Sequence, residues 1–210
     1  MRYFFISDIH GNLPALEKFV SEINKREDIV FMLGDIVNYG PWSNECIELL
    51  DTLSNVKYIM GNHEKYFLRQ VIPKYYLVKL FTNKCIDGFK YFEKIKKYKN
   101  KLSFNSYILK HTIFNKYIFK DTLVNINNNY IIGHSHQQYK ININKNTIFN
   151  PGSLGQNRKS LSNSDYGVYD IEKDKFILKT NIINSKYIID KMKINKYPNV
   201  CINYYLKMNV

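Results

Sequence analysis

Eight residues of this 210-residue sequence have side chains suited to binding metal ions, and they lie in five short polar segments. They are Asp8, His10, Asp35, Asn62, His63, His111, His134 and His136, and they include every histidine of the chain. Carboxylate, amide and imidazole groups without thiolates favour divalent transition ions such as manganese, iron, nickel or zinc. A single histidine would more often be an ordinary core or capping residue, but here none remains outside the set.

Each polar segment follows a short apolar run that is typical of a buried β-strand. The predicted strands are residues 3–6, 29–33, 56–60, 107–109 and 130–132. Open α/β sheets bind ligands at the carboxyl ends of their strands, so we expect these polar side chains to meet. Asp8 with His10, and His134 with His136, are two residues apart, which points both members of a pair the same way from an extended chain. A polar turn at the end of a strand is the alternative for each pair.

The remaining segments predict a mixed α/β fold. Apolar residues recur at helical spacing from Leu13, which Asn12 can cap, and again over residues 44–53. Residues 64–102 are expected to be mostly helical, with a break near Pro73. Further strands are predicted at 141–143, 147–149, 167–171 and 176–179, with a helix from about 183 and an irregular or strand-like end around 202–206. An α/β first half before a strand-rich second half predicts two packed sheets with helices outside.

The length suggests one domain, residues 1–210, that is large enough to bury its own core. The formal net charge is +13, from 31 Lys and Arg against 18 Asp and Glu, which invites a polyanionic partner. Only four of these cations are arginines, and the excess of lysine accompanies many Asn, Ile, Tyr and Phe residues, as an AT-rich genome would also produce. Nucleic acid is therefore kept as an alternative partner, not the favoured one. The lysines of segment 94–101 are interpreted as a solvated helix face.

Cys46, Cys85 and Cys201 are odd in number and far apart, so they predict neither a disulfide framework nor a zinc ribbon. They are typical of buried thiols in a reducing compartment. No apolar run approaches the ~20 residues of a membrane span, and charged residues precede any stretch of signal-peptide length. We expect a cytoplasmic protein without a membrane-spanning segment, and the oligomeric state is left open.

The polar segments also occur in a characteristic order: DIHGN, GDIVNYG, GNHE, a lone histidine, GHSH and NPGSLGQNR. This order resembles that of the calcineurin-like metallophosphoesterases, especially their small single-domain bacterial and archaeal branch, over roughly residues 1–180. The resemblance implies a four-layer α/β fold, a two-sheet β-sandwich flanked by helices. It also implies two divalent transition-metal ions, manganese foremost, and a small phosphorylated substrate. That substrate, a monoester or a diester, would be hydrolysed by direct attack of a metal-bridging hydroxide.

The resemblance also assigns a role to each residue. One metal ion would be held by Asp8, His10, Asp35 and His136. The other would be held by Asp35, Asn62, His111 and His134, with Asp35 as the bridge. His63 would act on the leaving group as a general acid, and His63 and Asp35 would be the catalytic residues. The phosphate would be bordered by Asn12, Asn38 and Arg158, for which a helix cap, a turn and a surface position are the respective alternatives.

Two positions depart from the family's pattern. Glu64 follows GNH where the family often has Asp, and His111 is followed by Thr112 and Ile113 where Gly and Ser are common. Two other functions stay open: a scaffold or binding module, as in the retromer subunit that resembles this family, and a nuclease. The first usually accompanies eroded metal motifs. The second is suggested by the positive charge but usually needs extra regions, for which 210 residues leave little room.

Overall fold

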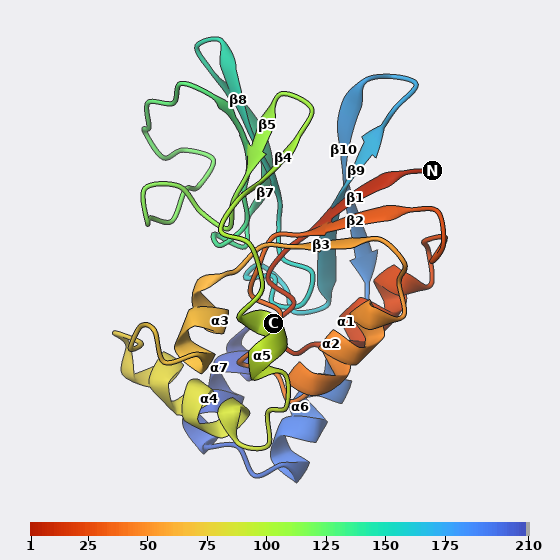
Figure 1. The fold of residues 1–210 in the computed structure, drawn as a ribbon. Helices are drawn as coiled ribbons and strands as arrows, with labels where there is room; N and C mark the ends of the chain where they lie inside the picture. Colours follow the sequence, from red (N-terminus) through yellow and green to blue (C-terminus); the bar gives the residue numbers. More distant parts are fainter. Residues whose placement is uncertain (209–210) are drawn as a thin grey trace.

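Two five-stranded sheets pack face to face, and helices cover one side and one end of this sandwich (Figure 1). The structure is a computed structural model that describes residues 1–208. The strand order is β10-β9-β1-β2-β3 in the first sheet and β4-β5-β6-β8-β7 in the second. This arrangement confirms the predicted α/β fold with two sheets flanked by helices.

The first sheet is built around three parallel strands from the beginning of the chain. They are β1 (Tyr3–Ile6), β2 (Ile29–Met32) and β3 (Val56–Tyr58), joined by α1 (Leu13–Val20) and α2 (Ser43–Asp51). The antiparallel hairpin of β9 (Asn163–Asp170) and β10 (Lys175–Ile182) completes the sheet beside β1. Because parallel strands end at the same edge of a sheet, the segments after β1, β2 and β3 emerge side by side.

The second sheet combines parallel and antiparallel strands. They are β4 (Leu102–Phe104), β5 (Tyr107–Leu109), β6 (Asn129–Ile131), β7 (Gln138–Ile143) and β8 (Asn146–Pro151). β5, β6 and β8 are parallel, and β4 and β7 pair antiparallel at the two edges. The segments that follow β5 and β6 therefore also leave their sheet at one end.

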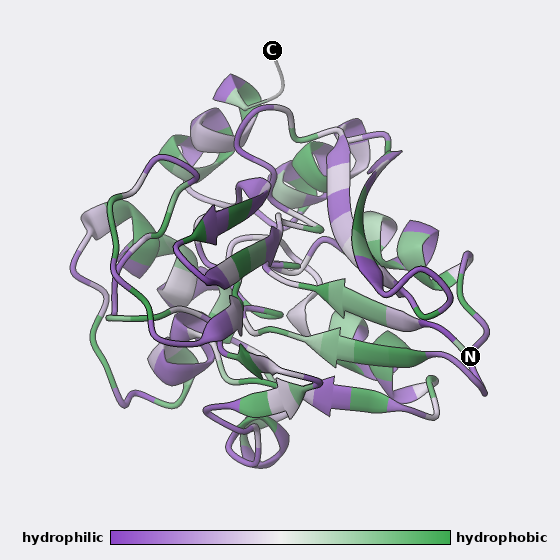
Figure 2. Ribbon diagram, turned by 90° about the horizontal axis from the view of Figure 1, so that it is seen from above, coloured by the Kyte–Doolittle hydropathy of each residue, from purple (hydrophilic) through white to green (hydrophobic). Residues whose placement is uncertain are grey.

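The inner faces of the two sheets meet through aromatic side chains. Phe5 is fully buried there and stacks on Phe31 with 5.2 Å between the ring centroids. It also meets Phe104 and Phe149 of the second sheet edge-on. Figure 2 shows the hydrophobic residues gathered in the central strands, with hydrophilic residues in the surrounding loops. The distance between the sheets is thus set by a layer of packed rings.

The two outer faces are covered in different ways. On the first sheet, α1 and α2 share one hydrophobic cluster with α6 (Lys186–Ile194) and α7 (Asn199–Lys207). On the second sheet, an irregular segment of residues 112–128 takes this place. Its residues Ile113 and Ile118 form a cluster with Ile148 of β8. The segment is therefore held by hydrophobic packing, although it contains neither a helix nor a strand.

The structure corrects the prediction for the middle of the chain. Residues 64–102 contain α3 (Asn62–Phe67), α4 (Tyr76–Ile86) and α5 (Phe92–Ile95), with Pro73 in a break as expected. Leu102, however, begins β4, a strand that the helical pattern did not predict. The lysines of segment 94–101 also run past the end of α5, so most of them lie outside the predicted helix face.

A second correction concerns residues 202–206, which were expected to be irregular or strand-like and lie within α7. Cys201 and Tyr205 are buried and four residues apart, so they share one face of a helix. This packing outweighs the preference of Ile202 and Tyr204 for strands, because β-propensity depends strongly on context. No helix of residues 1–208 has the length and apolar character to span a bilayer.

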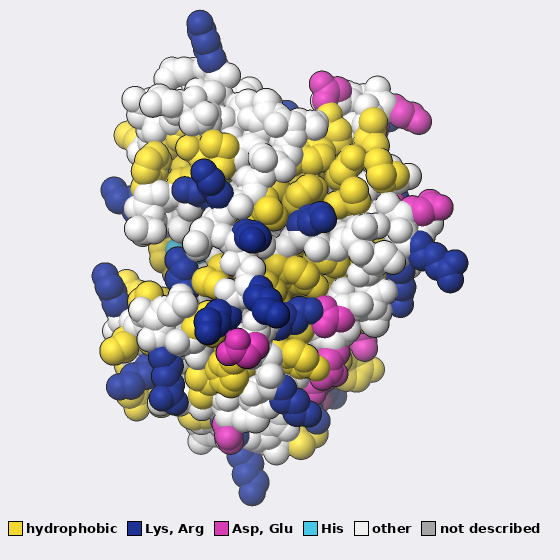
Figure 3. All heavy atoms as spheres, viewed as in Figure 1, with side chains coloured by type: hydrophobic (Ala, Val, Ile, Leu, Met, Phe, Trp, Pro, Cys, Tyr) yellow, Lys and Arg dark blue, Asp and Glu magenta, His cyan; other side chains and the backbone are white. Residues whose placement is uncertain are grey.

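Lysine and arginine side chains are spread over the face of the molecule in Figure 3, with acidic side chains at its upper right and right edge and among those of its lower half. Lys94 pairs with Asp51, and Lys96 lies 4.0 Å from Glu93. Exposed pairs of this kind contribute little to stability, but they reduce the local excess of positive charge. The lysines on this face are thus partly balanced by neighbouring acidic side chains.

Replacing Phe5 with Ala is expected to lower the free energy of unfolding by about 3–5 kcal/mol, because it leaves a cavity in the ring layer between the sheets. Urea unfolding would measure the change. Ile182, which is 71% exposed, provides the control: its replacement with Ala should change stability by less than about 0.5 kcal/mol. Equal stability of the two variants would contradict the packing described here.

Candidate metal centre

Loops that follow the strands of both sheets meet at one end of the sandwich. The loops after β1 and β2 run side by side, with Asp8 N donating to Gly34 O at 3.0 Å. The loops after β5 and β6 are joined by Gly133 N, which donates to His111 O at 3.0 Å. His134 N donates to Oδ2 of Asp8 at 2.9 Å, so a candidate ligand carboxylate connects the two sheets.

Asp8, His10 and His136 form the first group of candidate ligands. The Nε2 atoms of His10 and His136 are 3.2 Å apart, and Oδ1 of Asp8 lies 3.4 Å from the second and 3.8 Å from the first. All three side chains are buried, and Oδ1 of Asp8 has no hydrogen-bond partner within residues 1–208. Burial holds the pKa of both imidazoles well below its usual value, so their ring nitrogens keep lone pairs. An unpaired carboxylate oxygen and two nitrogens thus face one small volume, and this donor set fits a divalent cation.

Asp35, Asn62, His111 and His134 form the second group. Nε2 of His111 lies 3.0 Å from Oδ2 of Asp35, 3.0 Å from Oδ1 of Asn62 and 3.2 Å from Nδ1 of His134. Although burial opposes it, the charge of Asp35 raises the pKa of His111 to about 9. Without a bound cation, protonated His111 therefore provides positive charge among these atoms. A cation bound at the same place would provide positive charge instead. Asp35 also lies within a cluster of ligand atoms that includes His10, so it stands between the two groups.

Backbone carbonyl groups orient three of the imidazoles. The Nδ1 atoms lie 3.3 Å from Val37 O for His10, 2.8 Å from Leu33 O for His111, and 2.7 Å from Gln156 O for His136. A carbonyl oxygen only accepts, so each Nδ1 carries the hydrogen and each Nε2 faces the centre. Proteins commonly fix imidazole ligands of metal ions by such contacts.

Five candidate ligands have left-handed backbone conformations. Their φ angles are 55° for Asp8, 48° for His10, 61° for Asp35, 68° for His134 and 56° for His136. Residues other than glycine adopt this conformation at a cost of about 1–2 kcal/mol. Such strain persists where the surrounding structure holds it, and it is concentrated at functional sites. Here it belongs to the sharp turns that direct side chains from both sheets to one point.

Glu64 fastens two of the converging loops, a role that the sequence analysis did not find. Its carboxylate accepts hydrogen bonds from the N–H groups of Asp35 at 2.9 Å, Ile36 at 2.8 Å and Gly61 at 2.8 Å. Gly61 approaches so closely that a Cβ atom there would lie 2.0 Å from Oδ1 of Asp35. Burial, reinforced by the charge of Asp35, raises the pKa of Glu64 to about 7. The one feature of the sequence that could have drawn attention to this residue was that Glu64 follows GNH, where the family often has Asp.

The three residues predicted to border the phosphate have different surroundings. Asn12 is buried, caps α1 and donates to a backbone carbonyl at 2.7 Å. Asn38 is also buried, with its Nδ2 2.8 Å from Nδ1 of His63. Arg158 is exposed, and its charge acts on His136 and His63. Contact with phosphate stays a prediction for all three.

Tyrosine rings surround the candidate ligands. The ring centroid of Tyr39 lies 4.9 Å from that of His63, and the ring centroid of Tyr66 lies 5.0 Å from the same imidazole. Tyr117 lies on His134, with 4.1 Å between the centroids. Tyr66 and Tyr117 belong to segments without a chemical motif, so the sequence carried no local signal for their positions.

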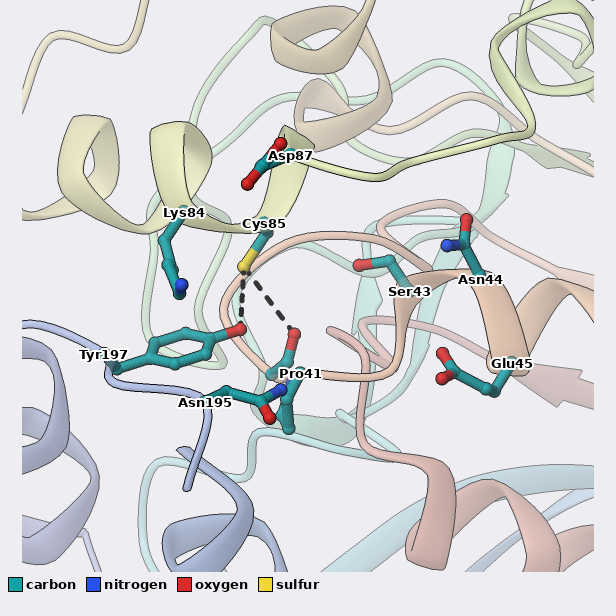
Figure 4. Close-up of a pocket in the computed structure, with 10 residues that line it drawn as sticks. Pro41, Ser43, Asn44, Glu45, Lys84, Cys85, Asp87, Asn195 and Tyr197 are labelled. Atoms are coloured by element: carbon teal, nitrogen blue, oxygen red, sulfur yellow. Dashed lines mark hydrogen bonds between the residues drawn. The ribbon is translucent and has the colours of Figure 1, made fainter. Parts of the chain in front are cut away.

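Two of the cavities in the structure are similar in size. One of about 340 Å³ is lined in part by His136, Arg158 and Lys159, and it opens beside the first ligand group. The other, of about 360 Å³, is shown in Figure 4, where Cys85 of α4 points to the hydroxyl of Tyr197 at 3.2 Å. Of these two cavities, only the first has a candidate ligand, His136, in its wall.

A model of the calcineurin-like phosphoesterases matches residues 1–192, which contain every candidate ligand. The chain belongs to this family. Over 89% of its length, this calcineurin-like phosphoesterase is 32% identical to an uncharacterized protein of Methanocaldococcus jannaschii, of which the match covers 88%. A shorter match, 34% identical, joins 30% of the chain to 24% of a symmetrical bis(5'-nucleosyl)-tetraphosphatase of Buchnera aphidicola.

Solved structures share the fold of this phosphoesterase. A metallophosphoesterase from Sphaerobacter thermophilus superimposes with a TM-score of 0.77 over 100% of both chains at 20% identity. A hypothetical protein from Pyrococcus horikoshii OT3 gives the same TM-score over 97% of both chains at 19% identity. At these identities the likeness concerns the fold, and the family membership rests on the sequence match.

Replacing Glu64 with Gln is expected to weaken Mn²⁺ binding and to lower the stability of the metal-free protein by about 1–3 kcal/mol, because a buried N–H group loses its acceptor. Calorimetric titration and thermal unfolding would measure the two effects. Glu93→Gln is the matched control, since that side chain is 83% exposed. Wild-type behaviour of Glu64→Gln in both measurements would show that the carboxylate does not fasten the loops.

Proposed function

We propose that this chain is a phosphoesterase whose centre holds two divalent transition cations, with manganese as the first candidate. One cation would bind Asp8, His10, Asp35 and His136. The other would bind Asp35, Asn62, His111 and His134. The observation that carries this proposal is the buried, unpaired Oδ1 of Asp8, 3.4 Å from Nε2 of His136. Oxygen and nitrogen lone pairs that face each other in a buried site repel unless positive charge lies between them.

Two such cations, when bound, would polarise the phosphate and lower the pKa of a water molecule that serves as nucleophile. Asp35 would keep them close together because it contributes to both sites. Its Oδ1 already accepts a hydrogen bond from His63 N at 2.8 Å, which fixes the carboxylate and leaves Oδ2 toward the centre. The shared aspartate would therefore enter the reaction with its orientation already set.

His63 would act on the leaving group. Nδ2 of Asn38 donates to Nδ1 of His63 at 2.8 Å, so the hydrogen of the neutral ring is on Nε2. Burial lowers the pKa of His63 to about 4, although Asp35 opposes the shift, and the ring is neutral at pH 7. We propose that Nε2–H donates a hydrogen bond to the departing oxygen and stabilises the charge that develops there.

The substrate would be a small phosphorylated molecule, part of which enters the cavity beside His136. Arg158 and Lys159 line this cavity, and both are exposed cations suited to a further anionic group. The partial similarity to a bis(5'-nucleosyl)-tetraphosphatase makes dinucleoside polyphosphates a class to test. The three cysteines are buried and free, which supports a cytoplasmic location.

Chelation is expected to abolish hydrolysis of nitrophenyl phosphate and bis-nitrophenyl phosphate, and added Mn²⁺ should restore it. Asp35→Asn should lower kcat/KM at least 100-fold, because it removes the charge shared by both cations. Asp190→Asn, at an exposed pair on α6, should keep wild-type activity. Turnover that persists in EDTA or in Asp35→Asn would contradict the proposal. Duplex and single-stranded DNA, tested in parallel, would reveal a nuclease.

His63→Ala should slow hydrolysis according to the leaving group. An alkyl phosphate, whose leaving oxygen needs stabilisation, is expected to lose about 100-fold or more in kcat, and nitrophenyl phosphate should lose much less. Steady-state kinetics on both esters would measure the ratio. Equal losses of kcat on both substrates would show that His63 does not act on the leaving group, and would indicate a structural role for this residue.

A further inference from the structure

His134 differs from the other candidate imidazole ligands in how its ring is held. His10, His111 and His136 each have a backbone carbonyl at the ring nitrogen that points away from the centre. Within residues 1–208, no hydrogen bond is found at Nε2 of His134, whose Nδ1 faces His111. His134 is also only half-buried, whereas the other three are buried. Any contact that restricts the rotation of this ring is therefore of another kind.

Tyr117 makes such a contact. Its ring lies almost parallel to the imidazole of His134, with 4.1 Å between centroids and 14° between planes. The backbone next to it is firmly anchored, because Ile118 is 1% exposed and its carbonyl accepts a hydrogen bond from Tyr139 at 2.6 Å. Lys120 N donates to the side chain of Gln137 at 2.8 Å and fastens the same segment beyond. The backbone on the C-terminal side of Tyr117 is thus fastened to the second sheet, while the Tyr117 ring itself is 43% exposed and lies on His134.

Arg158 contacts the ring of Tyr117 as well. Its guanidinium carbon lies 5.7 Å from the ring centroid, within the range of a cation–π interaction. Aromatic faces carry negative potential, so the ring can lie next to both a guanidinium group and a ligand of a cationic centre. The ring of Tyr117 can therefore hold the guanidinium group of Arg158 near a centre that would itself bind cations.

We propose that Tyr117 is a positioning residue of the metal centre, which orients the imidazole of His134 by stacking as backbone carbonyls orient the other three. The inference rests on the proposed function in one respect, that the centre binds cations. A flat contact restricts rotation about the bond between Cβ and the ring, and this rotation decides whether Nδ1 points at the centre. Tyr117 does not touch the substrate's reacting atoms in this role, and its effect passes through His134.

The test is a calorimetric titration of Mn²⁺ into the full-length protein and three variants. Tyr117→Ala should raise the Kd of the weaker Mn²⁺ site about tenfold, the size of effect that loss of an outer contact to a ligand produces. Tyr117→Phe keeps the flat ring and should stay within about twofold of wild type. Phe114→Ala is the matched control, because Phe114 is an aromatic residue of the same segment that is 58% exposed. It should bind Mn²⁺ as the wild type does.

The inference is overturned if Tyr117→Ala binds Mn²⁺ like the wild type, or if Phe114→Ala or Tyr117→Phe loses as much affinity. Circular dichroism melts of the metal-free proteins show whether each variant folds. If Tyr117→Ala does not fold, Tyr117→Leu replaces it, since leucine fills space without a flat face, and equal affinity of Tyr117→Leu and Tyr117→Phe overturns the inference. A wild type that binds Mn²⁺ but hydrolyses no ester would defeat the proposed function and leave this inference intact.

Discussion

Three carboxylates, Asp8, Asp35 and Glu64, are buried in one small region, and the rest of the site follows from how their charge is balanced. Backbone N–H groups bind all three, from His134 to Oδ2 of Asp8 and from His63 to Oδ1 of Asp35. The other oxygens of Asp8 and Asp35 face imidazole nitrogens. The carboxylates of Asp8 and Asp35 thus have two roles: one oxygen joins two loops, and the other is available to a cation. The geometry of the loops and the balance of charge therefore depend on each other.

Two sheets are needed to assemble such a site from short strands. The first sheet contributes two carboxylates, the imidazole of His10 and an amide after β1, β2 and β3, and the second contributes three imidazoles after β5 and β6. The ring layer around Phe5 holds the two sets of strand ends at a fixed separation. The turns after the strands then close the remaining gap by adopting left-handed backbone conformations. Core packing and the chemistry of the site are therefore parts of one arrangement.

Much of the fold could be predicted because its signals are local. The strand at Tyr3–Ile6 and the cap at Asn12 follow from short patterns, and the structure has both. The helix α7 could not be predicted in this way, since the burial of Cys201 and Tyr205 depends on distant elements. Glu64 followed a motif, but its three N–H partners lie in loops that meet only in the folded chain.

The same distinction applies to the site. The candidate ligands and their places after strands could be predicted from the sequence, because metal chemistry restricts which side chains can serve. The contact of Tyr117 with His134 was not, because many aromatic residues are available and nothing local distinguishes this one. Stacking and loop fastening place few restrictions on the neighbouring sequence, and they emerge only from tertiary packing.

The left-handed turns at Asp8 and Asp35 also shape how a lineage carrying this site can change. Asn and Gly accept that backbone conformation, whereas β-branched residues resist it. A descendant that abandoned catalysis would no longer need the charges, yet Val or Thr at these positions would still destabilise its fold, and so would loss of the oxygens that accept from His134 N and His63 N. Substitutions at these two positions would be mostly Asn or Gly. The backbone conformation of the former centre would then remain after the chemistry was lost.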